Sequence, residues 1–288
     1  MPPSKKTGAK KAAKKTAKKS AKKSAAKKSS SAVDRAAREW NLDQVMAELE
    51  AAGTEQNRKV YPRHGADPDK LFGVSFANYY KIAKDIRPGT GAAHKIAFEL
   101  WETENHDARV LACMIADPGK MEAADLDRWA GQAGNYIVAD AVATLTARTP
   151  IAESRVRRWA RARDEYTLRC AYTVLANLLK QEAEGEGKSK ASRSASRDIP
   201  KLDAEELAEH LKTIEDEIHD AFNRTREAMN TCLIALGTYR DDLRDDALAA
   251  AGRIGAVDVD HGETGCKTPD AAPYIHKAVE HRKAKKNA

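Results

Sequence analysis

The chain has 288 residues, of which 32% are charged, 42% hydrophobic and only 6% aromatic. This length and composition suit one large helical domain or two small ones. The apolar runs are far shorter than the roughly 20 residues that a membrane span needs, which argues against a membrane protein. Because the N-terminus lacks the apolar core of a secretory signal, we expect a cytoplasmic location.

Positive charge is concentrated at the N-terminus. Residues 1–31 contain 12 lysines and no acidic residue, whereas the rest of the chain has 38 Lys and Arg against 43 Asp and Glu. We interpret residues 1–31 as a disordered Lys-rich arm, because they have no apolar period with which to fold. Such an arm would follow DNA phosphates without sequence preference and keep the protein nucleoid-associated; a solubilising tail is the alternative.

Helical patterning begins beyond the arm. Apolar residues at helical spacing predict a first helix from about Val33 to Ala52, which Gly53 ends. A polar turn follows, and Asp67 or Asp69 is expected to open the next helices. From Gly73 to Leu179, amphipathic segments of ordinary helix length follow one another in pairs. Such pairs bury a core only by stacking on their neighbours, so the pattern predicts an all-α fold, an α-solenoid with a concave groove.

The second half of the chain continues this pattern after an interruption. The polar, Gly- and Ser-rich residues 181–200 predict a flexible insertion. Near the C-terminus, Ala256–Val259 is a candidate extended run, followed by a loop and a short basic helix. The expected domains are therefore the arm, a helical repeat domain at 32–254 and a C-terminal extension at 255–288. Further helices are predicted at Asp203–Asp220, Phe222–Gly237 and Asp241–Gly252.

Eight short pieces of sequence carry a resemblance to a known family. They are Phe72–Val74, Ala83–Lys84, Leu100–Trp101, His106–Arg109, Trp129, Tyr136–Asp140, Arg169–Ala171 and the stretch from Asn223 to Asn230. In their order and spacing, these pieces resemble the AlkD-like alkylpurine DNA glycosylases, which are HEAT-like repeat proteins of DNA alkylation repair. The resemblance extends over roughly Arg63 to Gly252.

The resemblance implies a definite activity. Active members of the family hold duplex DNA in the concave groove and hydrolyse the N-glycosidic bond of cationic N3- and N7-alkylpurines, without burying the base in a pocket. A cationic purine is already a good leaving group, so the reaction needs a carboxylate that stabilises the charge developing on the sugar and orients water. The resemblance further implies a monomer that uses no metal and no cofactor.

The catalytic residues follow from the same resemblance. Asp140 matches the family's catalytic Asp, and Tyr136 stands four residues earlier, where the family typically has Trp. Residues four apart share one face of a helix, so ring and carboxylate can both face the groove. Arg169 matches an arginine that contacts the phosphate backbone. On its chemistry alone, Asp140 is also explained as an interior residue that bonds a neighbouring helix end.

The aromatic residues fall into two groups. A second aromatic wall is expected late in the chain, but Thr231 stands at that position. The wall is then missing, or it is supplied by Trp159 or Tyr172. Trp101 and Trp129 lie among Leu and Ala at helical spacing and are interpreted as core residues.

Other polar residues are weaker candidates. Several cations could contact phosphate, although a solvated helix face explains each of them equally well. These are Lys81, Lys84, Arg148, Arg224 and Arg226. A C-terminal cluster has ligand types that suit zinc, but its spacing within one flexible loop is unspecific, so no metal is expected. This cluster is Asp258, Asp260, His261, Glu263 and Cys266.

Two alternatives to a glycosylase remain open at this point. One is a non-catalytic HEAT-like repeat protein that binds branched or structured DNA, with which the departure at Thr231 is compatible. The other is a protein-interaction solenoid whose Lys-rich arm alone touches nucleic acid. In each DNA-binding interpretation the partner is duplex or structured DNA, and no membrane partner is expected.

Overall fold

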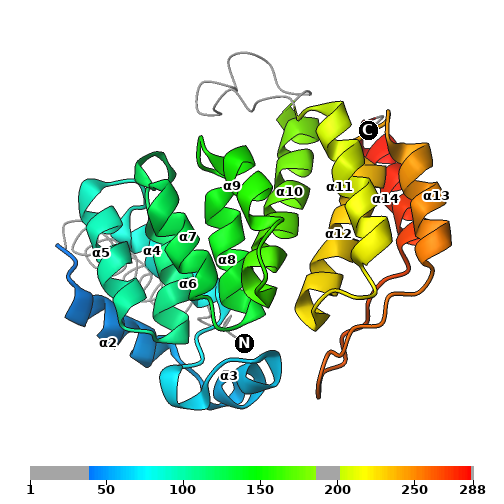
Figure 1. Cartoon of the computed structure of the whole chain (residues 1–288). Coiled ribbons are helices and arrows are strands. Elements are labelled where there is room, and N and C mark those ends of the chain that lie inside the picture. Colours follow the sequence, from blue (N-terminus) through cyan, green and yellow to red (C-terminus); the bar gives the residue numbers. More distant parts are fainter. Residues whose placement is uncertain (1–38, 186–201, 287–288) are drawn as a thin grey trace, which may run out of the picture. The chain divides into compact units, whose positions relative to one another are not determined.

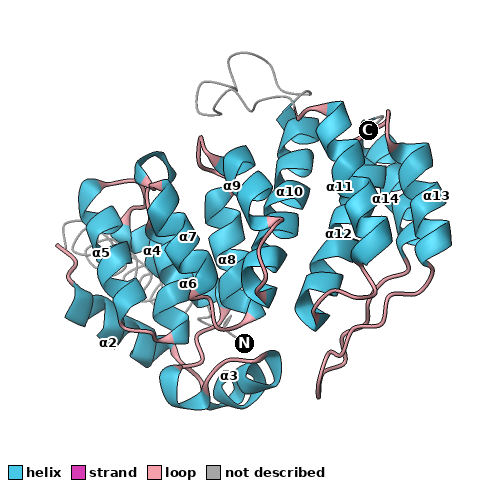
Figure 2. Cartoon of the chain, in the orientation of Figure 1, coloured by secondary structure: helices cyan, strands magenta, loops and turns pink. Residues whose placement is uncertain are grey.

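The computed structural model of this chain describes residues 39–185 and 202–286. The Lys-rich arm at 1–31 and most of the insertion expected at 181–200 lie outside these residues. From Leu42 onward the chain forms one compact unit, which includes the segment that the sequence set apart at 255–288. Within the described residues all regular elements are helices, as predicted, and the β-structure is limited to an isolated bridge between Gly53 and Val74 (Figures 1 and 2).

Thirteen α-helices and three 3-10 turns follow one another in the described part of the chain. The N-terminal helices are α2 (Leu42–Ala52), α3 (Glu55–Val60), α4 (Phe76–Ile86), α5 (Gly91–Glu102), α6 (His106–Ile115) and α7 (Ala123–Gly131). The remaining helices are α8 (Tyr136–Thr146), α9 (Ala152–Trp159), α10 (Glu165–Gly185), α11 (Ala204–Glu217), α12 (Asn223–Tyr239), α13 (Arg244–Ile254) and α14 (Ala271–Lys286). The 3-10 turns are η1 (Tyr61–His64), η2 (Pro68–Lys70) and η3 (Pro118–Lys120).

Every second helix belongs to a continuous row. Helix α4 packs on α6, α6 on α8, α8 on α10 and α10 on α12 (Figure 1). The helices between them pack on their successors, so that α5 contacts α6, α7 contacts α8, α9 contacts α10 and α11 contacts α12. This pairwise stacking is the arrangement of HEAT-like repeats, and it confirms the predicted α-solenoid. No described helix is long and apolar enough to cross a bilayer.

The two tryptophans predicted as core residues join neighbouring repeats. Trp101 of α5 and Trp129 of α7 are fully buried, with ring centroids 4.2 Å apart and planes inclined by only 2°. Trp101 Nε1 also donates a hydrogen bond to Gln132 Oε1 at 2.9 Å. Such ring pairs contribute about 0.5–1.5 kcal/mol beyond the area that they bury. The prediction for both residues is confirmed.

A buried carboxylate fixes the segment that leads into α4. Asp107, in the first turn of α6, accepts hydrogen bonds from the backbone N–H groups of Phe72, Gly73 and Val74 at 2.5, 3.1 and 2.8 Å. It also accepts one from the Tyr79 hydroxyl at 2.5 Å. Four donors satisfy a charge that is removed from water. The start of α4 is therefore held against α6, which positions one wall of the site.

Two helix starts differ from the prediction. Residues 39–41 are not helical and α2 begins at Leu42, so the helix predicted from about Val33 to Ala52 is not continuous; its first residues, 33–38, lie outside the described part of the chain. A helix is held mainly by burial of an apolar face, and this one buries no side chain before its own first turn. Asp67 caps only the short turn η2, whereas the long helices resume at α4, where Ser75 provides the N-cap.

The C-terminal part contains two further differences. The boundaries of α11, α12 and α13 agree with the prediction to within about three residues, but α14 is a full helix of 16 residues. Ala256–Val259 is not a strand, because no other strand pairs with it among the described residues. Side chains hold this segment instead: Asn223 of α12 donates to the Asp260 carbonyl at 2.8 Å and accepts from its N–H at 2.7 Å.

Candidate functional site

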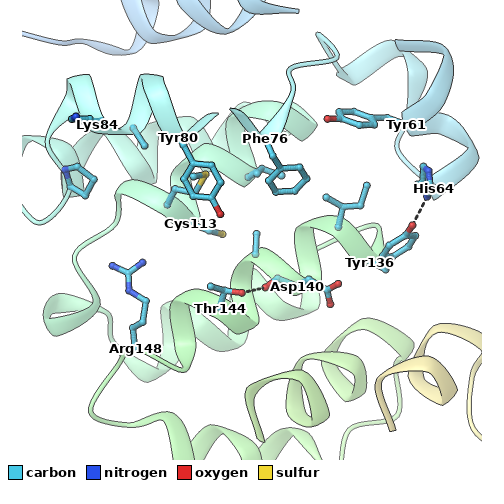
Figure 3. A pocket seen from close by; sticks show the side chains of 16 residues that line it. Tyr61, His64, Phe76, Tyr80, Lys84, Cys113, Tyr136, Asp140, Thr144 and Arg148 are labelled. Atoms are coloured by element: carbon cyan, nitrogen blue, oxygen red, sulfur yellow. Dashed lines mark hydrogen bonds between the residues drawn. The ribbon is translucent and has the colours of Figure 1, made fainter. Parts of the chain in front are cut away.

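Helix α8 presents Tyr136 and Asp140 on one face, as their four-residue spacing predicts. The helix is capped by Asn135, whose Oδ1 accepts hydrogen bonds from the backbone N–H groups of Ile137 and Val138, both at 3.1 Å. This cap places Tyr136 in the first turn of the helix. Both side chains line the same cavity (Figure 3), and 39% of the Asp140 side chain is exposed.

Asp140 is paired with Arg169 of α10. The guanidinium donates from Nε to Oδ1 at 2.8 Å and from Nη2 to Oδ2 at 2.9 Å, which is a two-point contact. Its Nη1 donates to Glu227 Oε2 at 2.9 Å and to the Arg224 carbonyl at 2.7 Å, both on α12. Arg169 thus connects α8, α10 and α12, and only 7% of its side chain is exposed. The arginine that the sequence suggested for phosphate contact is therefore a buried anchor.

The charges of this cluster balance one another. Burial by itself lowers the pKa of the Arg169 guanidinium, but Asp140 and then Glu227 raise that pKa above its usual value. Arg224 Nη1 lies 3.5 Å from Glu227 Oε2, so two guanidiniums face two carboxylates. Asp140 Oδ1 also accepts a hydrogen bond from the Thr173 hydroxyl at 3.5 Å, so Oδ2 is the oxygen with a second lone pair for a further hydrogen bond.

The Tyr136 ring is covered by arginine. The guanidinium carbons of Arg169 and Arg224 lie 5.0 and 4.3 Å from its centroid, within cation–π distance. Its hydroxyl is hydrogen-bonded to Nδ1 of His64, whose ring packs edge-on at 5.9 Å. Burial raises the pKa of Tyr136, whereas burial and then Arg224 lower the pKa of His64. These shifts favour the neutral form of both groups, so that the Tyr136 hydroxyl donates a hydrogen bond to the neutral His64 imidazole.

A cavity of 810 Å³ lies between α4, α6 and α8 and includes Asp140 in its lining (Figure 3). Phe76 and Tyr80 of α4 form one wall, and they are 50% and 66% exposed. Lys84 and Arg148 also line the cavity, and Asp140 is the single acidic residue among the described residues around it. The lining of the cavity therefore includes aromatic surface, two cations and one carboxylate.

The other predicted cations lie in different surroundings. Lys81 is exposed on α4 but does not line the cavity. Arg224 packs on Tyr136, and Arg226 donates from Nη1 to the Asp258 carbonyl at 2.8 Å. Arg226 thereby holds the segment that follows α13. The structure thus brings Asp140 and Tyr136 together with two of the six predicted cations, Lys84 and Arg148, at one cavity.

Neither Trp159 nor Tyr172, the two candidates for a second aromatic wall in place of Thr231, lines this cavity. Thr231 is exposed on α12, and its hydroxyl donates to the Glu227 carbonyl at 2.9 Å. Trp159 is buried, with its Nε1 donating to Asp127 Oδ1 at 2.7 Å. Tyr172 is also buried, and neither ring lines the cavity. The aromatic residue on the same helix as the carboxylate is therefore Tyr136, and its ring is already in contact with arginine.

The C-terminal loop is closed by its own hydrogen bonds. His261 Nε2 bonds the Thr268 hydroxyl at 2.9 Å, and Asp260 Oδ1 accepts from the Gly262 N–H at 2.7 Å. In the described part of the chain, no three His, Cys, Asp or Glu side chains are grouped as metal ligands. Asp260 and His261, two of the five loop residues that suggested a metal site, thus make local hydrogen bonds.

Sequence reasoning missed several residues of the site. Glu227 lies three residues after Arg224, a spacing that places the two charges on one helical face. Phe76 and Tyr80 lie four residues apart and so share one helical face, which is the signal that could have found them. His64 lies in a polar turn, and nothing in its local sequence indicates the contact with Tyr136.

Comparison with known proteins agrees with this geometry. A solved structure is similar over 84% of this chain and 95% of its own, with a TM-score of 0.70 and 27% sequence identity. It is described as one of a new family of proteins related to the HEAT-like repeat DNA glycosylases, with affinity for branched DNA structures. The fold and site thus define a HEAT-like repeat protein related to these glycosylases. Residues 45–275 match the DNA alkylation repair enzyme family, and the chain belongs to that family.

Two bacterial relatives are similar over most of their length. The uncharacterized protein Lin0241 of Listeria innocua and the uncharacterized protein Lmo0209 of Listeria monocytogenes are each 27% identical to this chain over 241 residues. The match covers 82% of this chain and 96% of either relative. The similarity therefore extends over the whole helical unit rather than over a single repeat.

Proposed function

We propose that this protein binds branched or structured DNA at the cavity between α4, α6 and α8, and that it does so without excising bases. The observation that carries the proposal is the state of the aromatic walls beside Asp140. Tyr136 is in contact with two guanidiniums, and Thr231 has no ring to offer. At these two positions a developing sugar cation would therefore find a ring that is already in contact with arginine, or no ring at all, where the family has aromatic faces. The similar solved protein with affinity for branched DNA supports the same function.

Phosphate contacts would come from Lys84 and Arg148 at the cavity and from the Lys-rich arm. The arm would raise the association rate and the residence time on any DNA, and its effect should fall steeply with salt. In this proposal the protein acts as a monomer that is associated with the nucleoid. The cavity would add the preference for particular DNA structures.

A DNA glycosylase for cationic N3- and N7-alkylpurines is the second candidate, and one observation favours it. The Asp140 side chain is 39% exposed at the cavity wall and is held in a fixed orientation by Arg169. A carboxylate fixed before the reaction, with lone pairs facing the ligand, is what stabilisation of a sugar cation requires. The opposing factor is the guanidinium itself, which offsets much of the negative charge at the reacting centre.

Single-turnover release of N7-methylguanine from alkylated duplex DNA separates the two functions. Release is compared between the wild-type protein and Asp140→Asn at saturating protein. In a second experiment, binding of a four-way junction is compared with binding of a linear duplex of equal length. The proposal predicts no release by either protein and tighter binding of the junction. Release by wild type that falls about tenfold or more in Asp140→Asn, a change of about 1.4 kcal/mol or more in the barrier, would establish the glycosylase.

The matched control is Asp216→Asn on α11. Asp216 is exposed and forms an ion pair with Lys212 at 2.7 Å, away from the cavity lining. Asp216→Asn makes the same chemical change as Asp140→Asn, and it should leave both the release of N7-methylguanine and the binding of the junction as in the wild-type protein. Equal binding of junction and linear duplex by the wild-type protein would contradict the structural preference that we propose.

A further inference from the structure

Two exposed aromatic side chains lie in one cavity, and this arrangement suggests a ligand that covers them. Among the described residues, four large hydrophobic side chains are exposed, and two of them, Phe76 and Tyr80, lie one turn apart on α4 and line the cavity. Burial of such rings is favourable by roughly 1.5–3 kcal/mol each, so their exposure costs stability unless something covers them. Tyr79, between them in sequence, is instead buried against Asp107.

The rest of the cavity suits flat rings. The same cavity as Phe76 and Tyr80 has apolar surface from Ile137 and Ala141 of α8 and from Val110 and Met114 of α6. The volume of 810 Å³ lies within the range of roughly 300–1,000 Å³ that is typical of sites for small organic groups. An aromatic group that enters would thus meet a π-face and aliphatic side chains.

The charges of the cavity select among the ligands that have such rings. Lys84 and Arg148 line it, and its acidic residue, Asp140, is already paired with Arg169. The cavity is therefore complementary to a chain of flat bases linked by phosphates, and less so to an apolar peptide or a neutral small molecule. Paired bases cannot offer their faces to side chains, whereas unpaired bases stack readily on aromatic rings.

We infer that the cavity binds an unpaired nucleobase, stacked on Phe76 and Tyr80, with the adjoining phosphates at Lys84 and Arg148. This inference rests on the proposed DNA binding and specifies the feature that is recognised: the unstacked base at a bulge, gap or branch point. Tyr136 does not stack on the base, because its ring is in contact with arginine.

Leucine substitutions test the inference, because leucine keeps apolar volume and removes the π-face. The full-length protein is compared with Phe76→Leu/Tyr80→Leu, using a duplex that carries a bulge of unpaired thymines and a fully paired duplex of equal length. The double variant should bind the bulged duplex at least about fivefold more weakly. Its affinity for the paired duplex should remain within about twofold of wild type, since phosphate contacts do not change. The control Tyr274→Leu removes an exposed ring from α14 and should behave as wild type.

Photo-crosslinking supplies a readout that does not depend on affinity. A 5-iodouracil in the bulge should crosslink to Phe76 or Tyr80, and the same base in the paired duplex should not. Crosslinks only to other residues, or an unchanged affinity of the leucine variant for bulged DNA, would overturn the inference while leaving the proposed DNA binding intact. Binding of neither duplex by the wild-type protein would instead refute the proposed function itself, and would leave an apolar protein partner as the occupant of the cavity.

Discussion

At the residue scale, Asp140 pairs with an arginine of another helix and not with a cation on its own helix α8. No Lys or Arg stands three or four residues from Asp140 in the sequence. Its guanidinium comes from α10, 29 residues further along the chain. Partial burial of a carboxylate is unfavourable unless it is hydrogen-bonded, and Arg169 supplies those hydrogen bonds. The same pairing withdraws Arg169 from solvent, so the cations available to phosphate must be others.

Replacing Arg169 and Lys84 by methionine should have opposite effects. Arg169→Met leaves Asp140 without its guanidinium and Glu227 with Arg224 alone, and it should lower the free energy of unfolding by about 3–5 kcal/mol, measured by urea denaturation. It should leave the salt dependence of DNA binding unchanged. Lys84→Met should barely alter stability but should reduce the slope of log K against log salt by about 1. A reduced slope for Arg169→Met, with stability retained, would contradict the anchoring role.

A buried histidine should make stability depend on pH. His106 is buried, and its Nδ1 accepts a hydrogen bond from Asn135 Nδ2 at 3.2 Å. Burial lowers the pKa of His106 below its ordinary value of 6.5, although Asp107 partly opposes this. The unfolded chain therefore binds the proton more readily, and stability that is fully present above about pH 6.5 is lost as the pH falls through the folded-state pKa.

Urea denaturation at about pH 7.5 and about pH 5.5 measures this effect. The free energy of unfolding should be lower at the acidic pH, and His106→Gln should show a smaller difference between the two values. Burial also lowers the pKa values of His64, His94 and His210, so the difference should shrink and not vanish. An equal pH dependence in wild type and variant would rule out His106 as a contributor.

At the scale of elements, α14 is attached through a close approach to α12. Gly237 in α12 faces Ile275 of α14, which is fully buried. A Cβ at Gly237 would lie 2.7 Å from Ile275 Cδ1 and 3.0 Å from both of its γ carbons. Only glycine allows the two helices to approach so closely. The C-terminal helix therefore belongs to the helical unit by packing and not by sequence continuity alone.

Gly237→Ala should lower the free energy of unfolding by about 1–3 kcal/mol through overpacking, despite the better helix propensity of alanine. Ile275→Ala should cost about 2–5 kcal/mol by itself. The double variant should cost less than the sum, because the second change removes the clash that the first creates. Gly252→Ala is the control: nothing lies within 4 Å of its Cβ position in α13, so it should stabilise by up to about 1 kcal/mol. Additive costs in the double variant would refute the contact.

At the scale of the whole molecule, the positive charge and the proposed selectivity for DNA structure lie in different parts of the chain. Residues 1–31 contribute 12 lysines, while the rest of the chain has a net charge of −5. Such a body is not attracted to DNA by its overall charge, so any site on it must gather cations locally. Lys84 and Arg148 at the cavity are such a local group.

Deleting residues 1–31 should lower the affinity for linear and branched DNA by the same factor. The salt slope should fall strongly, because the arm's lysines release counterions on any DNA. The ratio of the two affinities should remain, because the cavity sets it. Anisotropy titrations over a range of salt measure both quantities. Loss of all DNA affinity at low salt would mean that the helical unit is not a DNA site.

The sequence alone was sufficient to predict the repeat architecture, because amphipathic helices can be recognised from the local pattern of apolar residues. Apolar residues three and four positions apart, and breaks at residues such as Gly53, predict helices within a few residues of their observed bounds. The spacing of Tyr136 and Asp140 likewise placed both side chains on one helical face. These predictions required only the geometry of a single helix.

The tertiary structure decided what those side chains do. Three contacts join α8, α10 and α12. They are the pairing of Asp140 with Arg169, the hydrogen bond from Arg169 to Glu227, and the packing of the Arg224 guanidinium on the Tyr136 ring. Each contact depends on the packing of helices that are tens of residues apart in the sequence. The residues next to an arginine in the sequence do not show whether its guanidinium is buried or can reach a phosphate. Whether Arg169 faced solvent or a carboxylate was therefore set by packing, which no local spacing records.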